Sequence, residues 1–380
     1  MIYLDHAATT PLDDDVLQAM LPYLQNQYGN ASSSYALGRS AKNAIDAAKV
    51  RIASLIGADA QEIYMTSGGT EADNWALFGV MRAALPEKNH LIVSSIEHHA
   101  VLRCCKALER EGFCVTYAPV DRSGVVDIEA VQRAITPRTA MISVMLANNE
   151  VGTIQPVREI AALAHAHGAL MHTDAVQAAG HIGLNVDELS VDLLSMSAHK
   201  FYGPKGIGAL YMRKGTRVSR FIHGGEQEKG LRAGTENVAG IVGMGKAAEI
   251  ATMRLEADRM DLTHLRDLMV AHAKESLPCV TINGADAMRL PGHVHMTIDN
   301  ADATLLLMQL DMQGIAASSG SACASGITER SHVIHAMGIA KEHQADLRFT
   351  FGRQNTQADV MKTIDVLKCI LGNKGDFANL

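Results

Sequence analysis

The chain has 380 residues, of which 47% are hydrophobic and 20% charged, so it can bury a large core and is not disordered on a large scale. Its formal net charge is −7 and its Lys and Arg residues are scattered, which argues against direct binding of nucleic acid. No run of about 18 apolar residues indicates a membrane span, and the first residues lack the pattern of a secretory signal. We therefore expect a cytoplasmic protein with no membrane partner.

Residues 60–212 alternate short apolar runs with longer segments of helical period, which is typical of an α/β fold with crossover helices. Most of these runs are apolar throughout, as expected of strands that are buried on both faces. The predicted strands are residues 62–66, 90–94, 114–118, 140–146, 169–172, 192–195 and 208–212. The predicted helices are residues 71–84, 101–112, 128–135 and 157–167, of which the second and fourth end at Gly112 and Gly168.

A Gly-rich stretch at residues 224–234 precedes a long helical segment at 238–276, after which the pattern changes. Strand-like runs at residues 294–298, 314–318 and 347–351 indicate a smaller α+β unit. We therefore expect a large domain at residues 16–250. Residues 1–15 together with 251–380 would form the small domain.

Ligands of open α/β sheets bind beyond the carboxyl ends of the strands, so the residues that follow each strand are candidates for chemistry. Residues 67–71 (SGGTE) precede a helix and could hold a phosphate, although a turn without a ligand explains them equally well. Asp174 ends another strand, where a buried carboxylate needs a cationic partner such as a protonated pyridine nitrogen. From that segment alone, a helix-capping aspartate is the simpler interpretation.

Lys200 lies in the segment at 195–206 (SMSAHKFYGPKG), directly after a buried strand. A lysine at this position is poorly solvated, so its pKa should fall, as suits an amine that forms a Schiff base. A surface lysine in a loop is the common alternative. It is disfavoured here because Ser197 and His199 crowd the same turn, and Gly203 and Gly206 let the chain bend tightly.

Taken together, these segments resemble the fold-type I pyridoxal-phosphate enzymes, and more narrowly the cysteine desulfurases of the NifS and IscS kind. The resemblance covers nearly the whole chain and implies an α/β large domain with a mostly parallel seven-stranded sheet and a smaller α+β domain. The matching motifs are YLDHAATT at 3–10, TSGGTE at 66–71, EHHA at 97–100, NNEVG at 148–152, HTDAVQ at 172–177, the lysine segment, GGEQ at 224–227, RAGTEN at 232–237 and SSGSAC at 318–323.

The resemblance implies that pyridoxal 5′-phosphate is the cofactor. Lys200 would hold it as a Schiff base and later move the substrate's α-proton. His98 would stack on the pyridine ring and take part in proton transfer, Asp174 would pair with the ring nitrogen, and Gln177 would donate to the phenolic oxygen.

The same resemblance assigns the cofactor's phosphate to Gly69, Thr70, Ser197 and His199. Thr235 would reach the phosphate held by the other subunit, which implies a homodimer with shared active sites.

The substrate implied is L-cysteine, whose carboxylate would be bound by Arg353 with the help of Asn149. A guanidinium fork suits that task. A surface ion pair is the alternative for Arg353, and Arg348 is the nearest competing arginine.

Cys323 would take the sulfur as a persulfide, leaving alanine, and pass it to acceptor proteins such as an iron-sulfur scaffold. Ser, Gly and Ala flank this cysteine, which favours a loop. The other five cysteines form no Cys-x-x-Cys pair and are interpreted as ordinary apolar residues. No resident metal is expected, although the resemblance allows a transient iron-sulfur cluster on Cys323.

Several alternatives remain open from the sequence. The first alternative is another pyridoxal-phosphate reaction, such as transamination or selenocysteine cleavage. Cys323 and the long segment after it argue against both reactions. A metal-binding scaffold is suggested by 17 histidines, including His293 and His295, which could share a strand face. A protein that only docks sulfur without turnover is the third, and the intact Lys200 speaks against it.

Overall fold

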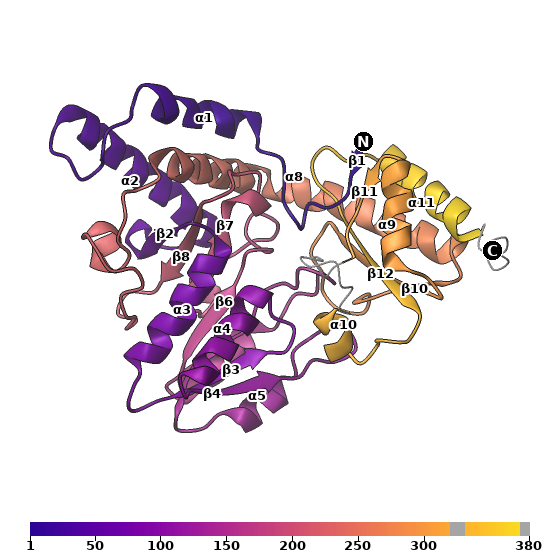
Figure 1. The fold of residues 1–380 in the computed structure, drawn as a ribbon, viewed down its shortest axis with the longest axis horizontal. Helices are drawn as coiled ribbons and strands as arrows, with labels where there is room; N and C mark the ends of the chain where they lie inside the picture. The colour runs from indigo at the N-terminus through magenta and orange to yellow at the C-terminus, as the bar shows by residue number, and fades with distance from the viewer. Residues whose placement is uncertain (320–330, 373–380) are drawn as a thin grey trace.

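The computed structural model describes residues 1–319 and 331–372. A seven-stranded sheet forms the centre of its larger part (Figure 1). The strand order is β2, β8, β7, β6, β5, β3, β4, in which β8 is antiparallel to both neighbours and the other pairs are parallel. The strands are β2 Ile63–Thr66, β3 His90–Ser94, β4 Cys114–Ala118, β5 Thr139–Ser143, β6 Leu170–Asp174, β7 Leu193–Ser197 and β8 Gly208–Met212. The predicted mostly parallel sheet is thus confirmed.

Helices cover both faces of this sheet. One face packs on α3 (Gly69–Ala83) and α4 (His99–Arg110), where Trp75 and Leu108 share a core with Leu91 of β3. The other face packs on α2, α5, α6 and the first part of the long helix α8 (Val238–Ser276). The remaining helices of this part are α1 Asp14–Gln25, α2 Ala36–Ile56, α5 Ile128–Ala134, α6 Val157–Ala166, α7 Val186–Leu189 and the short 3₁₀ turns η1 Ala60–Glu62, η2 Ala198–Lys200 and η3 Gln227–Gly230.

Two predicted helix ends are confirmed by backbone geometry. Gly112 follows α4 with φ of 92°, and Gly168 follows α6 with φ of 66°. Both values lie in the left-handed region, which glycine adopts without steric cost after the last helical turn.

A separate small domain has its own sheet and core (Figure 1). Strand β10 (His293–Asp299) pairs antiparallel with β12 (Gln344–Thr350) and β9 (Val280–Ile282). Strand β1 (Ile2–Tyr3) pairs in parallel with β11 (Ile315–Ala316), so the N-terminus joins this domain. Helices α9 Ala303–Met312 and α11 Gln357–Gly372 pack in its core, whereas α10 His332–Ala336 packs against Ile96, Met145 and Val151.

The two parts share one 39-residue helix, α8 (Val238–Ser276). Its residues 241–251 pack in the core of the large sheet, whereas residues 262–273 pack in the core of the small domain. The boundary at residue 250 stays a prediction. Within residues 1–319 and 331–372, no helix is long and apolar enough to cross a membrane.

Candidate active site

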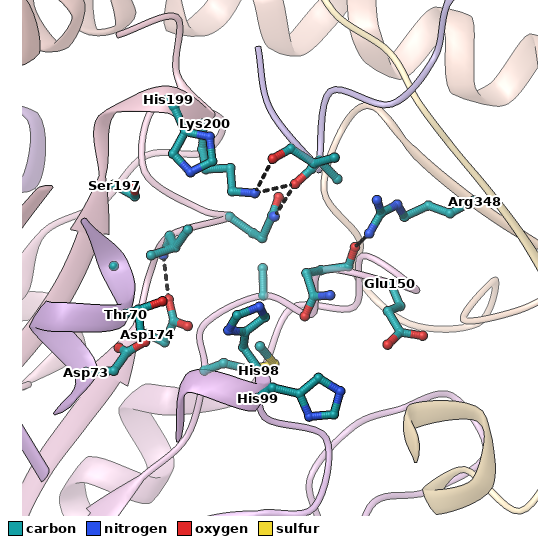
Figure 2. A pocket seen from close by; sticks show the side chains of 18 of the residues that line it. Thr70, Asp73, His98, His99, Glu150, Asp174, Ser197, His199, Lys200 and Arg348 are labelled. Carbon is teal, nitrogen blue, oxygen red and sulfur yellow. Dashed lines mark hydrogen bonds between the residues drawn. The ribbon is translucent and has the colours of Figure 1, made fainter. Parts of the chain in front are cut away.

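A cavity of about 370 Å³ lies where the parallel strands of the large sheet end (Figure 2). Its volume falls in the range of small-molecule sites. Nine of the predicted site residues line it: Gly69, Thr70, His98, Asn149, Asp174, Gln177, Ser197, His199 and Lys200. Segments from residues 69 to 200 are thus brought together at one edge of the sheet, as expected from parallel strands.

Three predicted residues are not among those that line the cavity. Thr235 is exposed on the surface of the chain, and Arg353 is bound elsewhere, as described below. Cys323 lies outside the described residues.

Lys200 ends the 3₁₀ turn that follows β7 and extends its amine into the cavity (Figure 2). Its Nζ donates to the carbonyl oxygens of Ala7 and Ala8 at 2.6 and 2.8 Å. Burial, followed by the positive charge of Arg348, lowers the pKa of Lys200 to about 8. An amine with such a pKa is partly unprotonated near neutral pH, so it can act as a nucleophile or base.

Asp174 is the last residue of β6 and lines the same cavity. One carboxylate oxygen accepts the N–H of Val176 at 2.8 Å, and burial raises the pKa of Asp174 to about 6. Within the part of the chain that the structure describes, no cation forms an ion pair with Asp174. A buried carboxylate of this kind is stabilised by a cationic group that enters the cavity.

A second acid, Asp73 of α3, lies deeper in the wall of the cavity. Burial and the nearby charge of Asp174 raise the pKa of Asp73 well above its usual value. Because Asp73 is the more buried and Asp174 accepts a backbone N–H, we assign the proton of this pair to Asp73. Asp174 then carries the charge that faces the cavity.

The start of α3 forms the polar end of the cavity. A Cβ atom at Gly69 would lie 2.6 Å from Cγ2 of Val176, so only glycine lets the backbone come this close. The N–H groups of Gly69 and Thr70 begin a 15-residue helix and suit an anion. Ser197 and His199 line the same end, and Nδ1 of His199 lies 3.1 Å from Oγ1 of Thr9.

His98 caps α4 from the opposite side of the cavity from Lys200 (Figure 2). Its Nδ1 accepts the N–H of Ala100 at 3.1 Å, so the neutral ring carries its proton on Nε2. Loss of solvation, followed by the charge of Lys200, lowers the pKa of His98 to about 4. Gln177 donates its amide to the carbonyl oxygen of Ala7 at 2.9 Å, which fixes its side chain at the cavity wall.

Arg348 of β12 reaches the cavity from the small domain. Its guanidinium donates to the carbonyl oxygen of Asn149 at 2.8 Å and to Asp5 at 2.7 Å. Its Nε is buried and has no hydrogen-bond partner in the described residues. Arg348 therefore places a buried positive charge next to Asn149 at the cavity. Its Nε–H is still able to donate a hydrogen bond.

Arg353 does not reach the cavity. Its Nε donates to Asp258 at 2.6 Å, and one terminal nitrogen lies 3.4 Å from a carboxylate oxygen of Asp13. Both carboxylates neutralise this guanidinium at a distance from the cavity. The position of Arg353 thus does not support the predicted contact with a substrate carboxylate, whereas Arg348 lines the cavity.

Sequence reasoning missed several polar residues of the cavity wall. Glu150 accepts the hydroxyl of Ser331 at 2.5 Å, and burial raises its pKa. The rings of His99 and His332 lie 4.9 Å apart, and Nε2 of His332 lies 2.9 Å from the carbonyl oxygen of Glu97. His99 and Glu150 are part of the EHHA and NNEVG motifs, which could have indicated them, whereas His332 was only the end of the long segment after Cys323 and had no assigned role.

The family of the chain follows from comparison with known proteins. The model of the family described as aminotransferase class-V matches residues 2–362. The chain thus belongs to the class-V aminotransferases, whose cofactor is pyridoxal phosphate.

Full-length relatives narrow this class. A cysteine desulfurase IscS of Dictyoglomus turgidum is 48% identical over 97% of this chain and 94% of its own length. A solved NifS-like protein is 36% identical, with a TM-score of 0.92 over 98% of this chain and 99% of its own. Another structure, SspA in complex with cysteine, is 36% identical with a TM-score of 0.82 over 92% and 99%. Within its class, the chain belongs to the cysteine desulfurase family.

The residues present fit pyridoxal phosphate. Asp174 offers a buried carboxylate that has no ion-pair partner in the described residues and can meet a cationic ring nitrogen, and Lys200 offers an amine of lowered pKa for a covalent link. The helix start at Gly69 leaves room that any larger residue would fill, which suits a phosphate group. The three features lie around one cavity of a suitable volume.

Proposed function

We propose that this protein is a desulfurase that removes sulfur from L-cysteine, leaving L-alanine and a persulfide on Cys323. The carbon–sulfur bond of the substrate breaks, a carbon–hydrogen bond forms in alanine, and the sulfur forms a sulfur–sulfur bond with the Cys323 sulfur. The thiol proton balances the equation, so no external oxidant or reductant is needed. The observation that supports the proposal most is the pair formed by Lys200 and Asp174 at one cavity.

Pyridoxal phosphate, when bound, supplies an electron sink for charge that develops on the substrate's α-carbon. Asp174, which faces the cavity as the charged member of its pair, would hold the proton on the ring nitrogen. Lys200 would accept the α-proton, since a pKa of about 8 is close to working pH. His98 would cover the ring and take part in proton transfer, and Gln177 would donate to the phenolic oxygen.

The substrate's carboxylate is assigned to Arg348 and Asn149. The buried guanidinium of Arg348 is held by Asp5 and by the backbone of Asn149, so its direction is fixed before the substrate arrives. Preorganised donors of this kind bind a carboxylate without further loss of side-chain entropy. This assignment replaces Arg353.

The phosphate would be held by Gly69, Thr70, Ser197 and His199. The exposed position of Thr235 in the single chain is consistent with a role toward the cofactor of a second subunit, so we propose a homodimer.

The persulfide would pass to acceptor proteins such as an iron-sulfur scaffold, in the cytoplasm, where thiols stay reduced. The name of the Dictyoglomus relative and the cysteine bound to SspA support the substrate and this role. We further propose that residues 16–250 form the domain that binds the cofactor. Residues 1–15 with 251–380 would then form the domain that carries Cys323.

The test is the absorbance spectrum of the purified protein before and after addition of L-cysteine, with alanine and sulfide measured in parallel. The variants are Cys323→Ala and, as a matched control, Cys114→Ala, which removes an exposed cysteine of β4. We expect a visible band that shifts with cysteine in all three proteins. Alanine should form in the wild type and in the Cys114 variant but not in the Cys323 variant.

Other outcomes contradict the proposal in different ways. Alanine formation that does not depend on Cys323 would indicate a lyase of the selenocysteine kind. The absence of a visible band would overturn the assignment of the cofactor site.

A further inference from the structure

Arg353 joins three segments of the chain outside the cavity. It follows β12 in the small domain and donates to Asp258 of α8, while a second nitrogen approaches Asp13, the residue that caps α1. Its guanidinium carbon also lies 4.2 Å from the centroid of the Tyr202 ring. A cation over an aromatic face is favourable, and more so where water is excluded.

The backbone of Tyr202 is unusual. Its φ is 65°, although the side chain is a bulky aromatic and only 5% of the residue is exposed. A residue of this type is rarely found in the left-handed region and stays there only where its surroundings hold it. Tyr202 therefore stores conformational strain that neighbouring groups must balance.

The groups that hold Tyr202 come from the N-terminal segment and from Arg353. The N–H of Tyr202 donates to Oγ1 of Thr10 at 2.7 Å, and its carbonyl oxygen accepts the N–H of Asp13 at 3.1 Å. Its hydroxyl accepts the backbone N–H of Arg353 at 2.8 Å. The small domain thus contacts Tyr202 through Arg353 twice, by this bond and by the guanidinium over the ring.

Tyr202 lies two residues after Lys200, in the same tight turn. The N–H groups of Phe201 and Gly203 both donate to the carbonyl oxygen of Ala198, at 3.1 and 2.9 Å. Thr10 donates its own N–H and its hydroxyl to the carbonyl oxygen of His199. A change in the backbone of Tyr202 would therefore move the backbone from which the amine of Lys200 extends.

We propose that Arg353 is a positioning residue, which holds Tyr202 in its strained conformation and so fixes the place of the Lys200 amine. The inference rests on the proposed function, in which Lys200 moves the substrate's proton. It gives Arg353 a role in turnover without contact to the substrate. A misplaced amine slows proton transfer while the carboxylate site at Arg348 stays intact.

The experiment compares Arg353→Gln with Arg254→Gln in the cofactor-loaded enzyme. Arg254 is a matched control, because it pairs with the same Asp258 at 3.1 Å but has 49% of its side chain exposed, and the guanidinium over the Tyr202 ring is that of Arg353. Tyr202→Phe removes only the hydroxyl that accepts from Arg353. The charged and titratable groups around Lys200 are unchanged in all three variants; they are Arg348, Asp174, Asp5, His98, His181, His199 and His293.

For Arg353→Gln we expect kcat to fall about 10- to 100-fold while the KM for L-cysteine changes less than about 2-fold. The pH midpoint at which the visible band of the cofactor titrates should also shift, since this midpoint depends on the geometry of the amine. Tyr202→Phe should change kcat and this pH midpoint in the same direction as Arg353→Gln, but to a smaller extent. Arg254→Gln should match the wild type.

The outcomes separate this inference from the proposed function. A wild type without a visible band or without alanine formation would overturn the proposed function itself. With an active wild type, an unchanged kcat and band titration in Arg353→Gln would overturn the positioning role. A rise in KM alone would restore Arg353 as a substrate ligand and overturn it as well. If Arg353→Gln does not fold, Tyr202→Phe provides the test. A kcat and a pH midpoint of the visible band that both equal the wild-type values in this variant would overturn the inference.

Discussion

The two sides of the cavity differ in how their residues reach it. On the side of the large sheet, Asp174 ends β6 and Lys200 ends the short turn after β7, so chain order alone brings them to one edge. On the side of the small domain, Arg348 lies within β12, an antiparallel strand. There, only the alternation of side chains and the packing of the two domains decide which residue faces the cavity.

The difference shows which kind of reasoning applies to each side. The rule for parallel strands needs only the strand ends, and the segment 67–71, Asp174 and Lys200, which it singled out, all contribute residues to the cavity. Arg348 and Arg353 are five residues apart, and which of them reaches the cavity depends on how the two domains pack. Each prediction below changes one side of the cavity and compares it with a matched substitution.

The largest effect is expected on the side of the sheet. Asp174→Asn removes the charge that would hold the proton on the ring nitrogen, so we expect kcat to fall at least about 100-fold, as when a positioned acid–base group is lost. Asp73→Asn makes the same chemical change at a residue that we assign as already protonated. It should cost less than about 10-fold.

Steady-state kinetics with L-cysteine and the visible spectrum of each variant check this pair. Equal losses in the two variants would mean that the pair shares its charge, contrary to our assignment of the proton to Asp73.

Much of the fold could be predicted because local patterns carry it. The seven strands of the sheet, the long helix α8 and the glycines that end α4 and α6 follow from apolar periodicity and from glycine's conformational freedom. The strained φ of Tyr202 could not be predicted, because it depends on Thr10, Asp13 and Arg353, which are distant in sequence. His332 enters the cavity wall for the same reason, through the packing of α10.

An intermediate effect is expected on the side of the small domain. Arg348→Lys keeps the positive charge but loses the guanidinium fork, so the KM for L-cysteine should rise about 10- to 100-fold, the range of a charge-assisted hydrogen bond. Arg353→Lys makes the same change at the arginine outside the cavity and should leave this KM within about 2-fold of the wild type. Kinetics over a range of cysteine concentrations measure both. The opposite pattern would return the substrate carboxylate to Arg353.

The smallest effect concerns stability and pH on the side of the sheet. Because burial lowers the pKa of Lys200 to about 8, the unfolded chain binds more protons at this residue than the folded chain between pH 8 and 10.5. The stability of the cofactor-free protein should therefore rise with pH across this window, and the cost of burying the charged amine should be fully present below pH 8.

Lys200→Met removes this cost, so it should stabilise the protein by on the order of 1–3 kcal/mol at pH 7 and by less at pH 9.5. Urea unfolding at both pH values, with the exposed Lys205→Met as control, measures the difference. A gain that is the same at both pH values would mean that apolar packing of the methionine, and not the charge of Lys200, causes it.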